Sequence, residues 1–350
     1  MIGTPPSFAA TPESDGAGHD VLAEMLRAVR LTGSVYLNAC FTAPFGIVSP
    51  KQFDEHTPMA HLRHISIFHL ISAGECSVEL ATGERRKVSA GDILLMPFAD
   101  THKFWNGHPK EHVVADDVVR PGPLKGMWNI NHGGGGNETR VVCGFIESSE
   151  FLLTPVFRTL PPLLVDRTGD DQVSALIAST VKQILAMTES AAAGSELMLG
   201  RLMELLFVEV LRRYAMSLPP SAKGWFAALN DPIVGRTLQF MHRDPARRWT
   251  VDDLAHVAGS SRTVLAERFQ AVLGQAPIEY LTSWRMQLAA ERIRTGRDGL
   301  AAIAAEVGHD SEAAFNRAFK RVTGVTPGRW RDSPPPATGG DAFGPKGAAT

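Results

Sequence analysis

The chain has 350 residues, of which 44% are hydrophobic and 21% are charged, and its formal net charge is −2. This length allows two or three domains, and the apolar content is sufficient for large cores. No apolar run reaches the ~18 residues that a membrane span needs, so we expect no membrane partner.

The small net charge hides an uneven distribution along the chain. Residues 1–224 carry 19 Lys and Arg against 24 Asp and Glu, which gives −5, whereas residues 225–331 carry 15 against 11, which gives +4; residues 332–350 add −1. A basic C-terminal block on an acidic body is what phosphate contact by one end would require. A surface charge of this size is also ordinary in proteins that bind no nucleic acid.

Both ends of the chain differ in composition from the middle. Residues 1–18 lack a basic region followed by an apolar one, so they are not an export signal, and we expect a disordered leader. Residues 332–350 are rich in Pro and Gly and predict a disordered tail. The cysteines are widely spaced and odd in number, which favours reduced thiols in the cytoplasm over disulfides or a zinc site. They are Cys40, Cys76 and Cys143.

The first ordered elements are an amphipathic helix expected over residues 19–29 and strand-like sequence over residues 31–49. Residues 61–106 alternate between short strands and tight turns. Many short antiparallel strands with hairpin turns predict a jelly-roll barrel. In residues 61–71 the side chains alternate between two faces. One face has His61, Arg63, Ile65, Ile67, His69 and Ile71, and the other has Ser66, Phe68 and Leu70.

One segment of this predicted barrel carries a specific motif. Residues 91–106 have the sequence GDILLMPFADTHKFWN. This resembles the second conserved motif of the cupins: Gly, five residues, Pro-x-Gly, two residues, His, three residues, Asn. Gly91, Pro97, His102 and Asn106 match this pattern, and Ala99 replaces its second glycine.

The resemblance to cupins raises the question of a metal. Cupins often bind one through the equivalent of His102, a His-x-His pair and a Glu on an earlier strand. Counted back from Gly74, these three positions fall on His61, Arg63 and Ile67, so two imidazoles remain of four ligands. A non-haem metal site normally has three or more protein ligands. We therefore expect no metal and no cofactor.

The barrel lumen is instead predicted to bind a small molecule. Arg63 could form a forked contact with a carboxylate or phosphate, and three histidines could add polar contacts: His61, His69 and His102. Each histidine could equally be a hydrogen-bonded structural residue of the barrel.

Further along, residues 107–140 are predicted to be rich in loops. The glycines at 133–136 are followed by no Gly-Lys-Ser, so they are no phosphate-binding loop and favour a flexible hairpin connection. The sequence TRVVCGFIESS then predicts a strand, and LPPLLVDRTGD, residues 160–170, predicts a linker.

Residues 171–216 predict two helices that are separated at Gly194, each with apolar residues at steps of three and four. The second helix is so apolar that something must cover it. The outside of the barrel could do so, or a second copy of the chain, and we favour a homodimer. Residues 161–218 are therefore a helical connector and a candidate dimerisation region.

The C-terminal stretch, residues 249–331, contains one short pattern twice. The copies are LAHVAGSSRTVLAERFQAVLGQAPIEY and IAAEVGHDSEAAFNRAFKRVTGVTPGRW. Each has an apolar helix that ends at a glycine (Gly259, Gly308), a short polar turn, a second helix and a closing Gly-x-x-Pro. This is the helix-turn-helix unit, whose second helix fits the major groove of DNA.

This stretch resembles the DNA-binding domain of AraC/XylS-type bacterial transcriptional regulators, which carries two such units joined by a long helix. Both glycines, both prolines and the pair Phe315 and Phe319 match. With the barrel and the helices before it, the chain resembles the members that have an N-terminal cupin-like sensor. The resemblance implies an α+β multidomain protein with a ligand-sensing domain over 19–160 and an all-α double helix-turn-helix domain over 225–331.

The domain has several expected helix boundaries. Asp231 and Pro232 are predicted to start a helix that ends at Asp244, and Thr250 with Asp253 predicts a capping box. Ser261 and Ser311 are the expected N-caps of the two second helices. Four aromatic or apolar residues should point inward by spacing: Leu265, Phe269, Phe315 and Phe319.

The outward residues of the two second helices are the predicted DNA contacts. Arg317 is predicted to hydrogen-bond to guanine and Asn316 to adenine. Lys320 and Arg321 are suited to contact phosphates. Glu267 could accept from cytosine or merely hold an arginine, and all of these residues could instead be solvated helix faces. The full set is Arg262, Thr263, Ala266, Glu267, Glu312, Ala313, Asn316, Arg317, Lys320 and Arg321.

The segment PIEYLTSWRMQLAAERIRTG joins the two units and predicts one long helix. A stiff helix there would place the two reading helices about one duplex turn, ~34 Å, apart. One chain could then occupy two successive major grooves.

These observations predict a transcription regulator and no enzyme. Its expected partners are double-stranded DNA, a small-molecule effector and a second copy of itself, with RNA polymerase as a further candidate. One alternative is a metal-dependent cupin enzyme, a dioxygenase or isomerase, with a regulatory tail. Another is a DNA-binding protein whose barrel is vestigial and binds nothing.

Overall fold

A computed structural model describes residues 20–27, 31–49, 65–122, 127–147, 157–167, 172–188 and 193–332 of the chain. The strands are β1 (Thr32–Thr42), β2 (Phe45–Ser49), β3 (Ile65–Ala73), β4 (Glu75–Leu80), β5 (Arg85–Ser89), β6 (Asp92–Met96), β7 (His102–Asn106), β8 (Val113–Val114), β9 (Arg120–Pro121), β10 (Trp128–Gly133), β11 (Glu138–Glu147) and β12 (Leu164–Arg167). The helices are α1 (Val21–Arg27), α2 (Ala115–Val118), η1 (Phe157–Thr159), α3 (Gln172–Thr188), α4 (Ser195–Ser217), α5 (Trp225–Ala228), α6 (Val234–Arg243), α7 (Val251–Val257), α8 (Arg262–Leu273), α9 (Pro277–Thr295), α10 (Leu300–Glu306), α11 (Glu312–Thr323) and α12 (Pro327–Asp332). No helix in these ranges is long and apolar enough to cross a membrane.

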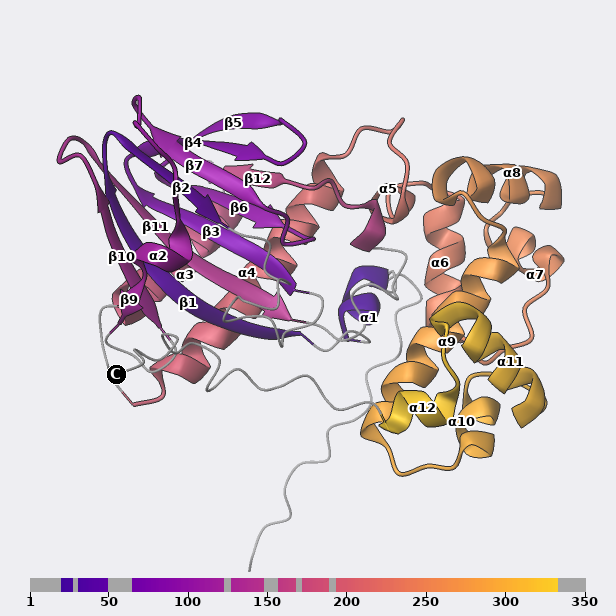
Figure 1. The fold of residues 1–350 in the computed structure, drawn as a ribbon. Coiled ribbons are helices and arrows are strands. Elements are labelled where there is room, and N and C mark those ends of the chain that lie inside the picture. The colour runs from indigo at the N-terminus through magenta and orange to yellow at the C-terminus, as the bar shows by residue number, and fades with distance from the viewer. Residues whose placement is uncertain are drawn as a thin grey trace, which may run out of the picture.

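The N-terminal part is built from two sheets (Figure 1). The seven-stranded sheet has the order β12-β6-β3-β11-β1-β10-β9, and the five-stranded sheet has the order β5-β4-β7-β2-β8. Most neighbours are antiparallel, and the exceptions within the described strands are β1 with β10 and β2 with β8. The sheet-rich cupin-like region that the sequence predicts is therefore confirmed.

Strand β3 shows how the sequence fills two cores at once. Ile67 and Ile71 point into the core between the sheets, which we call the lumen core. Phe68 and Leu70 point to the opposite face and belong to a second cluster, the shared core. Successive side chains of a strand face opposite ways, so a strand that is buried on both faces is apolar almost throughout. The predicted grouping of residues is confirmed from Ile65 onward, whereas His61 and Arg63 lie outside the described residues.

The glycine run after β10 makes no hairpin, and that prediction is wrong. Strands β10 and β11 pair with opposite edges of β1, so the chain between them crosses over the end of β1. Gly134 and Gly136 donate backbone N–H groups to the carbonyl oxygens of Thr42 and Ala43 at 2.9 and 2.8 Å. Residues 128–133 form strand β10, although the sequence predicted a loop there. The prediction missed this strand because it is short and has few apolar residues.

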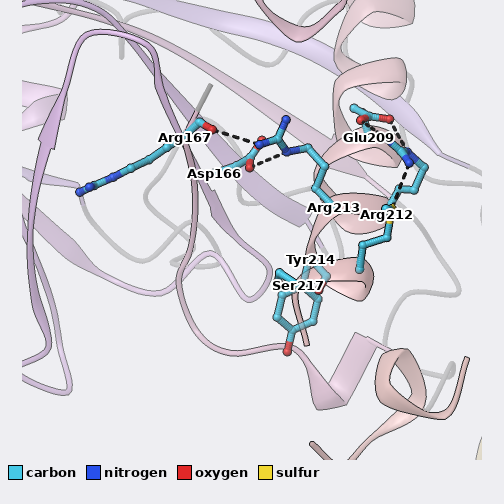
Figure 2. Close-up of polar contacts among 8 residues, drawn as sticks. Asp166, Arg167, Glu209, Arg212, Arg213, Tyr214 and Ser217 are labelled. Carbon is cyan, nitrogen blue, oxygen red and sulfur yellow. Dashed lines mark hydrogen bonds and ion pairs between the residues drawn. The ribbon is translucent and has the colours of Figure 1, made fainter. Parts of the chain in front are cut away.

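Residues 164–167 also differ from the linker that the sequence predicts. They form β12, which pairs with β6 at the edge of the larger sheet. Arg213, near the end of α4, donates through Nε to Asp166 Oδ1 at 2.9 Å and through Nη2 to the carbonyl oxygen of Arg167 at 3.1 Å (Figure 2). The pairing partner and this arginine are distant in sequence, so local composition could not indicate a strand.

Helix α4 covers the outer face of the seven-stranded sheet. Gly33 on β1 and Gly200 on α4 let the two backbones touch, because a Cβ on Gly33 would lie 2.4 Å from the carbonyl oxygen of Gly200. The buried face of α4 joins the shared core through Met203, Leu206, Phe207 and Val210. Packing on the outside of the barrel, one of the two predicted fates of this helix, is confirmed.

The C-terminal part is all helical, and α1 and α4 both contact it. Helix α1, which lies between the seven-stranded sheet and the C-terminal helices, packs on α6 and buries Val21 and Met25 (Figure 1). Tyr214 of α4 meets Phe226 of α5 edge to face, with ring centroids 5.5 Å apart. Asn230 donates from its side chain to the carbonyl oxygen of Ala215 at 2.8 Å.

The boundaries of the C-terminal helices follow the predicted caps. Before α6 the carboxylate of Asp231 accepts the backbone N–H groups of Ile233 and Val234 at 3.0 and 2.9 Å, and its carbonyl oxygen accepts that of Gly235 at 2.8 Å. Asp231 therefore caps this end as predicted, and the regular helix runs from Val234. It ends before Asp244, as predicted. The predicted capping box of α7, between Thr250 and Asp253, is present in both directions.

Candidate nucleic-acid interface and sensor site

The two predicted reading helices, α8 and α11, are built alike. Each has 12 residues and starts at a serine whose hydroxyl accepts the N–H three residues on: Ser261 from Val264 and Ser311 from Ala314, both at 3.3 Å. Each ends at a glycine in the left-handed region, Gly274 or Gly324. The inward residues Leu265, Phe269, Phe315 and Phe319 are all fully buried.

On α8 the predicted contact residues Arg262, Thr263, Ala266 and Glu267 are all exposed. They lie in the first two turns, which is the end of a recognition helix that meets base edges. Arg262 Nε is 3.2 Å from Asp252 Oδ1, and both side chains are exposed. An exposed ion pair is weak, so Arg262 can exchange Asp252 for a guanine or a phosphate at little cost in free energy.

On α11 the predicted contact residues are exposed with one exception. Asn316 is half-buried, and its Oδ1 is shielded from solvent without a hydrogen-bond partner among the described residues. A bidentate contact with adenine uses both the amide oxygen and the amide nitrogen. In this conformation Asn316 therefore does not present the pair that the sequence predicts. The exposed residues are Glu312, Ala313, Arg317, Lys320 and Arg321.

The first unit carries a buried polar network that sequence reasoning missed. Trp225 donates through Nε1 to Tyr280 Oη at 2.9 Å, and Tyr280 Oη is 2.7 Å from His242 Nε2. The His242 ring stacks on Trp284 at 4.1 Å. Burial raises the pKa of Tyr280, so its hydroxyl stays protonated and can donate to the imidazole. The network ties α5, α6 and α9 together, and no local motif marks it, because its members come from three helices.

A second contact that was missed fixes α8 against the loop before α6. Arg268 forms an ion pair with the buried carboxylate of Asp231. Burial by itself would raise the pKa of Asp231, but the N–H groups of Val234 and Ile233 and the Arg268 guanidinium more than offset this and lower it. The carboxylate is therefore ionised at neutral pH and holds α8 in place.

In the sensor, the structure brings two of the predicted effector residues together. His69 on β3 and His102 on β7 lie edge to face, with ring centroids 4.8 Å apart, and Phe104 packs on both. His69 Nδ1 is 2.9 Å from the sulfur of Cys143 on β11, a neighbour that the sequence did not predict. His102 Nδ1 is 2.8 Å from the carbonyl oxygen of Asp100. A carbonyl only accepts, so Nδ1 carries the proton and Nε2 of His102 is a lone-pair acceptor.

Burial keeps this cluster uncharged. Burial and the neighbouring His102 hold the pKa of His69 well below its ordinary value. Burial lowers the pKa of His102 to about 4, although the carbonyl of Asp100 acts in the opposite direction. Burial raises the pKa of the Cys143 thiol. Nε2 of each histidine is buried and has no hydrogen-bond partner among the described residues.

This donor set does not fit a metal ion. No group of three or more His, Cys, Asp or Glu in the described residues is arranged to hold one. His102 occupies the cupin motif position, Asn106 donates to the carbonyl oxygen of Glu75 at 2.8 Å, and Ala99 adopts the positive φ of 48° that suits the motif glycine. The barrel therefore keeps the framework of the cupin motif.

Comparison with known proteins agrees with this architecture. The family model described as Cupin matches residues 20–216, and the one described as Helix-turn-helix domain matches residues 254–333. A protein of Streptomyces antibioticus that is described as an AraC-like transcription regulator is 38% identical over 207 residues, which are 59% of this chain and 68% of that protein. The chain belongs to the AraC-like transcription regulators. It is a helix-turn-helix regulator with a cupin-type N-terminal domain.

Two further proteins align with a larger share of this chain. The HTH-type transcriptional regulator AlkR of Acinetobacter baylyi is 25% identical over 282 residues, which are 76% of this chain and 87% of AlkR. The crystal structure of ToxT from Vibrio cholerae aligns with 87% of this chain and 97% of its own, at 11% identity and a TM-score of 0.34. The two family models and the Streptomyces antibioticus protein confirm the predicted family and two-part fold, and helix-turn-helix domains of this family bind DNA.

Proposed function

We propose that the regulator recognises two adjacent DNA boxes with α8 and α11, and that a small molecule bound in the sensor controls this recognition. The supporting observation is the paired construction of the two helices. Both are capped by serine and anchored inward by buried side chains, and each has an exposed arginine within its first two turns, Arg262 as the first residue of α8 and Arg317 as the sixth of α11. Arginine is the residue that most often pairs with guanine in the major groove.

A selection from random double-stranded oligonucleotides with the full-length protein tests this proposal. We expect an enriched site with two boxes about 10–10.5 base pairs apart, centre to centre. Failure to enrich any sequence would contradict it. Genome-wide recovery of bound DNA would then locate the operators and the genes that they control.

For the effector, we propose the region of the lumen next to His69 and His102. The unpaired Nε2 of His102 could accept a hydrogen bond from an uncharged polar group of a ligand, and that of His69 could accept from one or donate to one. The predicted residues Arg63 and His61 lie outside the described residues and keep their proposed roles as ligand contacts. A thermal-melt screen against small acids and sugars should find a ligand that stabilises the protein, whereas a screen without any such ligand would favour a vestigial barrel.

We also propose that the regulator forms a homodimer through the free side of α4. Large apolar side chains are exposed along this side, with Leu197 and Met216 each 68% exposed. The stripe is Leu197, Met198, Leu205 and Met216. An isologous contact buries the same surface of both copies, so the apolar stripe on α4 of one copy would pack on the same stripe of the other. Toward the end of α4, Arg212 donates to both carboxylate oxygens of Glu209 and to the sulfur of Met216 (Figure 2).

The oligomeric state in solution tests this contact. Light scattering should give the mass of a dimer for the wild type and of a monomer for Leu205→Glu. Glu196→Gln, on the same helix, serves as the control. A wild-type monomer at micromolar concentration would contradict the proposal.

We propose further that the regulator works in the cytoplasm, with RNA polymerase as a partner at its promoters, and that the barrel is a sensor and not an enzyme. Its relatives are regulators, which supports the second point. Metal analysis of the purified protein separates the two readings. Stoichiometric iron or manganese that is lost in His102→Ala would favour a cupin enzyme.

A further inference from the structure

The two helix-turn-helix units touch directly, beside the helix α9 that joins them. The turn of the second unit, residues 308–310, lies against the loop that precedes α7 of the first unit. A Cβ on Gly308 would lie 2.4 Å from the carbonyl oxygen of Ala246, so no side chain fits there. Arg248 also pairs with Asp310 across this contact. The units are thus packed backbone to backbone at this point.

Arg285, on α9, holds the two sides of this contact with one guanidinium group. Its Nε donates to the carbonyl oxygen of Pro245 at 2.7 Å, and its Nη2 donates to that of Arg247 at 2.8 Å. Its Nη1 donates across the contact to the carbonyl oxygen of Gly308 at 3.4 Å. A guanidinium group is planar and its donors are fixed relative to one another, so it constrains the positions of all three acceptors.

The position of Arg285 along α9 is as informative as its bonds. The residue before it, Trp284, belongs to the shared core with the first unit, and the residue after it, Met286, belongs to the core of the second unit. Arg285 therefore lies where α9 passes from one unit to the other. Burial lowers the pKa of Arg285, and the neighbouring Asp244 and Asp310 favour its charged form.

The equivalent turn of the first unit is not held in this way. Gly259 has a φ of +67°, close to the +78° of Gly308, but a Cβ there would meet nothing within 4 Å. The two glycines thus have the same backbone conformation in different surroundings. Only the turn of the second unit is fixed against its neighbour.

We propose that Arg285 is a positioning residue that sets the orientation of the second unit about α9, and so the separation of the two DNA boxes. This inference rests on the proposed recognition of DNA by α8 and α11. Arg285 is half-buried on the inter-unit contact and belongs to neither reading helix. Its loss should leave recognition of each box intact and relax the required distance between them.

The experiment measures the affinity of the full-length protein for the selected site with the spacer changed by one or two base pairs in each direction. We expect the wild type to lose about tenfold or more in affinity, 1.4 kcal/mol, at a wrong spacing. Arg285→Met keeps the apolar stem and removes the donors, and it should reduce this loss to about threefold or less. Gly308→Ala breaks the same contact from the other side and should flatten the profile similarly.

Two matched controls separate this effect from general damage. Gly259→Ala imposes the same backbone strain at a turn with free space, and Arg292→Met removes an exposed arginine of α9 that pairs with Glu306 within the second unit. Both should keep the wild-type spacing profile. A profile that flattens equally in the controls would overturn the inference.

The outcomes also distinguish this inference from the proposed function. If Arg285→Met folds and weakens binding equally at every spacing, Arg285 is only a structural residue and the inference is wrong. If Arg285→Met does not fold, the same affinity series is measured with Arg285→Lys and Gly308→Ala. If both variants keep the wild-type dependence of affinity on spacer length, the inference is wrong. If the wild type selects no sequence from the random oligonucleotides, the proposed function fails instead.

Discussion

The two helix-turn-helix units share one sequence pattern but differ in what covers them. In the first unit, Leu265 and Phe269 belong to the shared core, which continues through Trp225 and Phe207 to the outer face of the sheet at Phe68. In the second unit, the buried side chains form a separate cluster with α9, α10 and α12, which we call the distal core. A repeated motif therefore specifies the local shape of a unit, whereas its coupling to the sensor depends on the neighbours that complete its core.

The largest expected effect comes from truncating one aromatic residue in each core. Phe269→Ala and Phe319→Ala should each cost about 3–5 kcal/mol of unfolding free energy, because both rings are fully buried. Hydrogen exchange should show faster exchange in α4 and α6 for Phe269→Ala. For Phe319→Ala it should be confined to α9–α12. Equal spreading in both variants would show that the two cores are not separate.

A pH titration should affect the sensor before the second unit. Burial keeps His102 neutral, with a pKa of about 4 against 6.5 for an ordinary histidine, so the unfolded chain binds a proton that the folded chain does not. The stability that His102 contributes is therefore complete above pH 6.5 and is lost as the pH falls toward 4, by up to about 3 kcal/mol.

Denaturant midpoints between pH 7 and pH 4 measure this loss. His102→Gln should reduce the pH dependence. Because the first unit shares its core with the sensor, its hydrogen exchange should rise with acid before that of the second unit. The opposite order would contradict the coupling that we describe.

Removing one arginine from each reading helix compares the units in DNA binding. Arg262→Ala and Arg317→Ala should each weaken binding by about 1–3 kcal/mol and relax sequence preference in one box only. The loss should be smaller for Arg262, because binding DNA replaces its existing pair with Asp252. Affinities for sites with one box mutated measure this, with Arg297→Ala, an exposed arginine outside both helices, as the control. A loss spread evenly over both boxes would contradict the assignment.

The smallest expected effect concerns the helix caps. Ser261→Ala and Ser311→Ala should each cost about 1 kcal/mol, since each removes one hydroxyl that accepts a backbone N–H. Thermal melts should give similar losses for the two variants, because the caps are local and the cores are not involved. Ser260→Ala, next to a cap, should cost a few tenths of a kcal/mol at most. A much larger loss for one serine would mean that it has a tertiary role.

The accuracy of the sequence predictions follows the range of the interactions. Caps, turn glycines and inward aromatic residues were predicted because they depend on residues within about one or two helical turns. Strands β10 and β12 were missed because each is defined by a distant partner, β1 or β6. The cap before α6 was predicted as well, because the Asp231 carboxylate accepts N–H groups only two and three residues further along the chain.

The candidate sites divide in the same way. The exposed faces of α8 and α11 follow from helical periodicity, whereas Cys143 beside His69 and the three acceptors of Arg285 come from other segments. Asn316 was predicted to face outward, and packing leaves it half-buried.

The sequence by itself determined that this chain has a strand-rich cupin-like part followed by two helix-turn-helix units, because periodicity, caps and turn glycines are local properties. Only the tertiary structure decided that the first unit shares its core with the sensor, that the second does not, and that Arg285 lies between them. The physical reason is that burial and hydrogen-bond partnership depend on residues far apart in the chain, and no local pattern specifies which of them will meet.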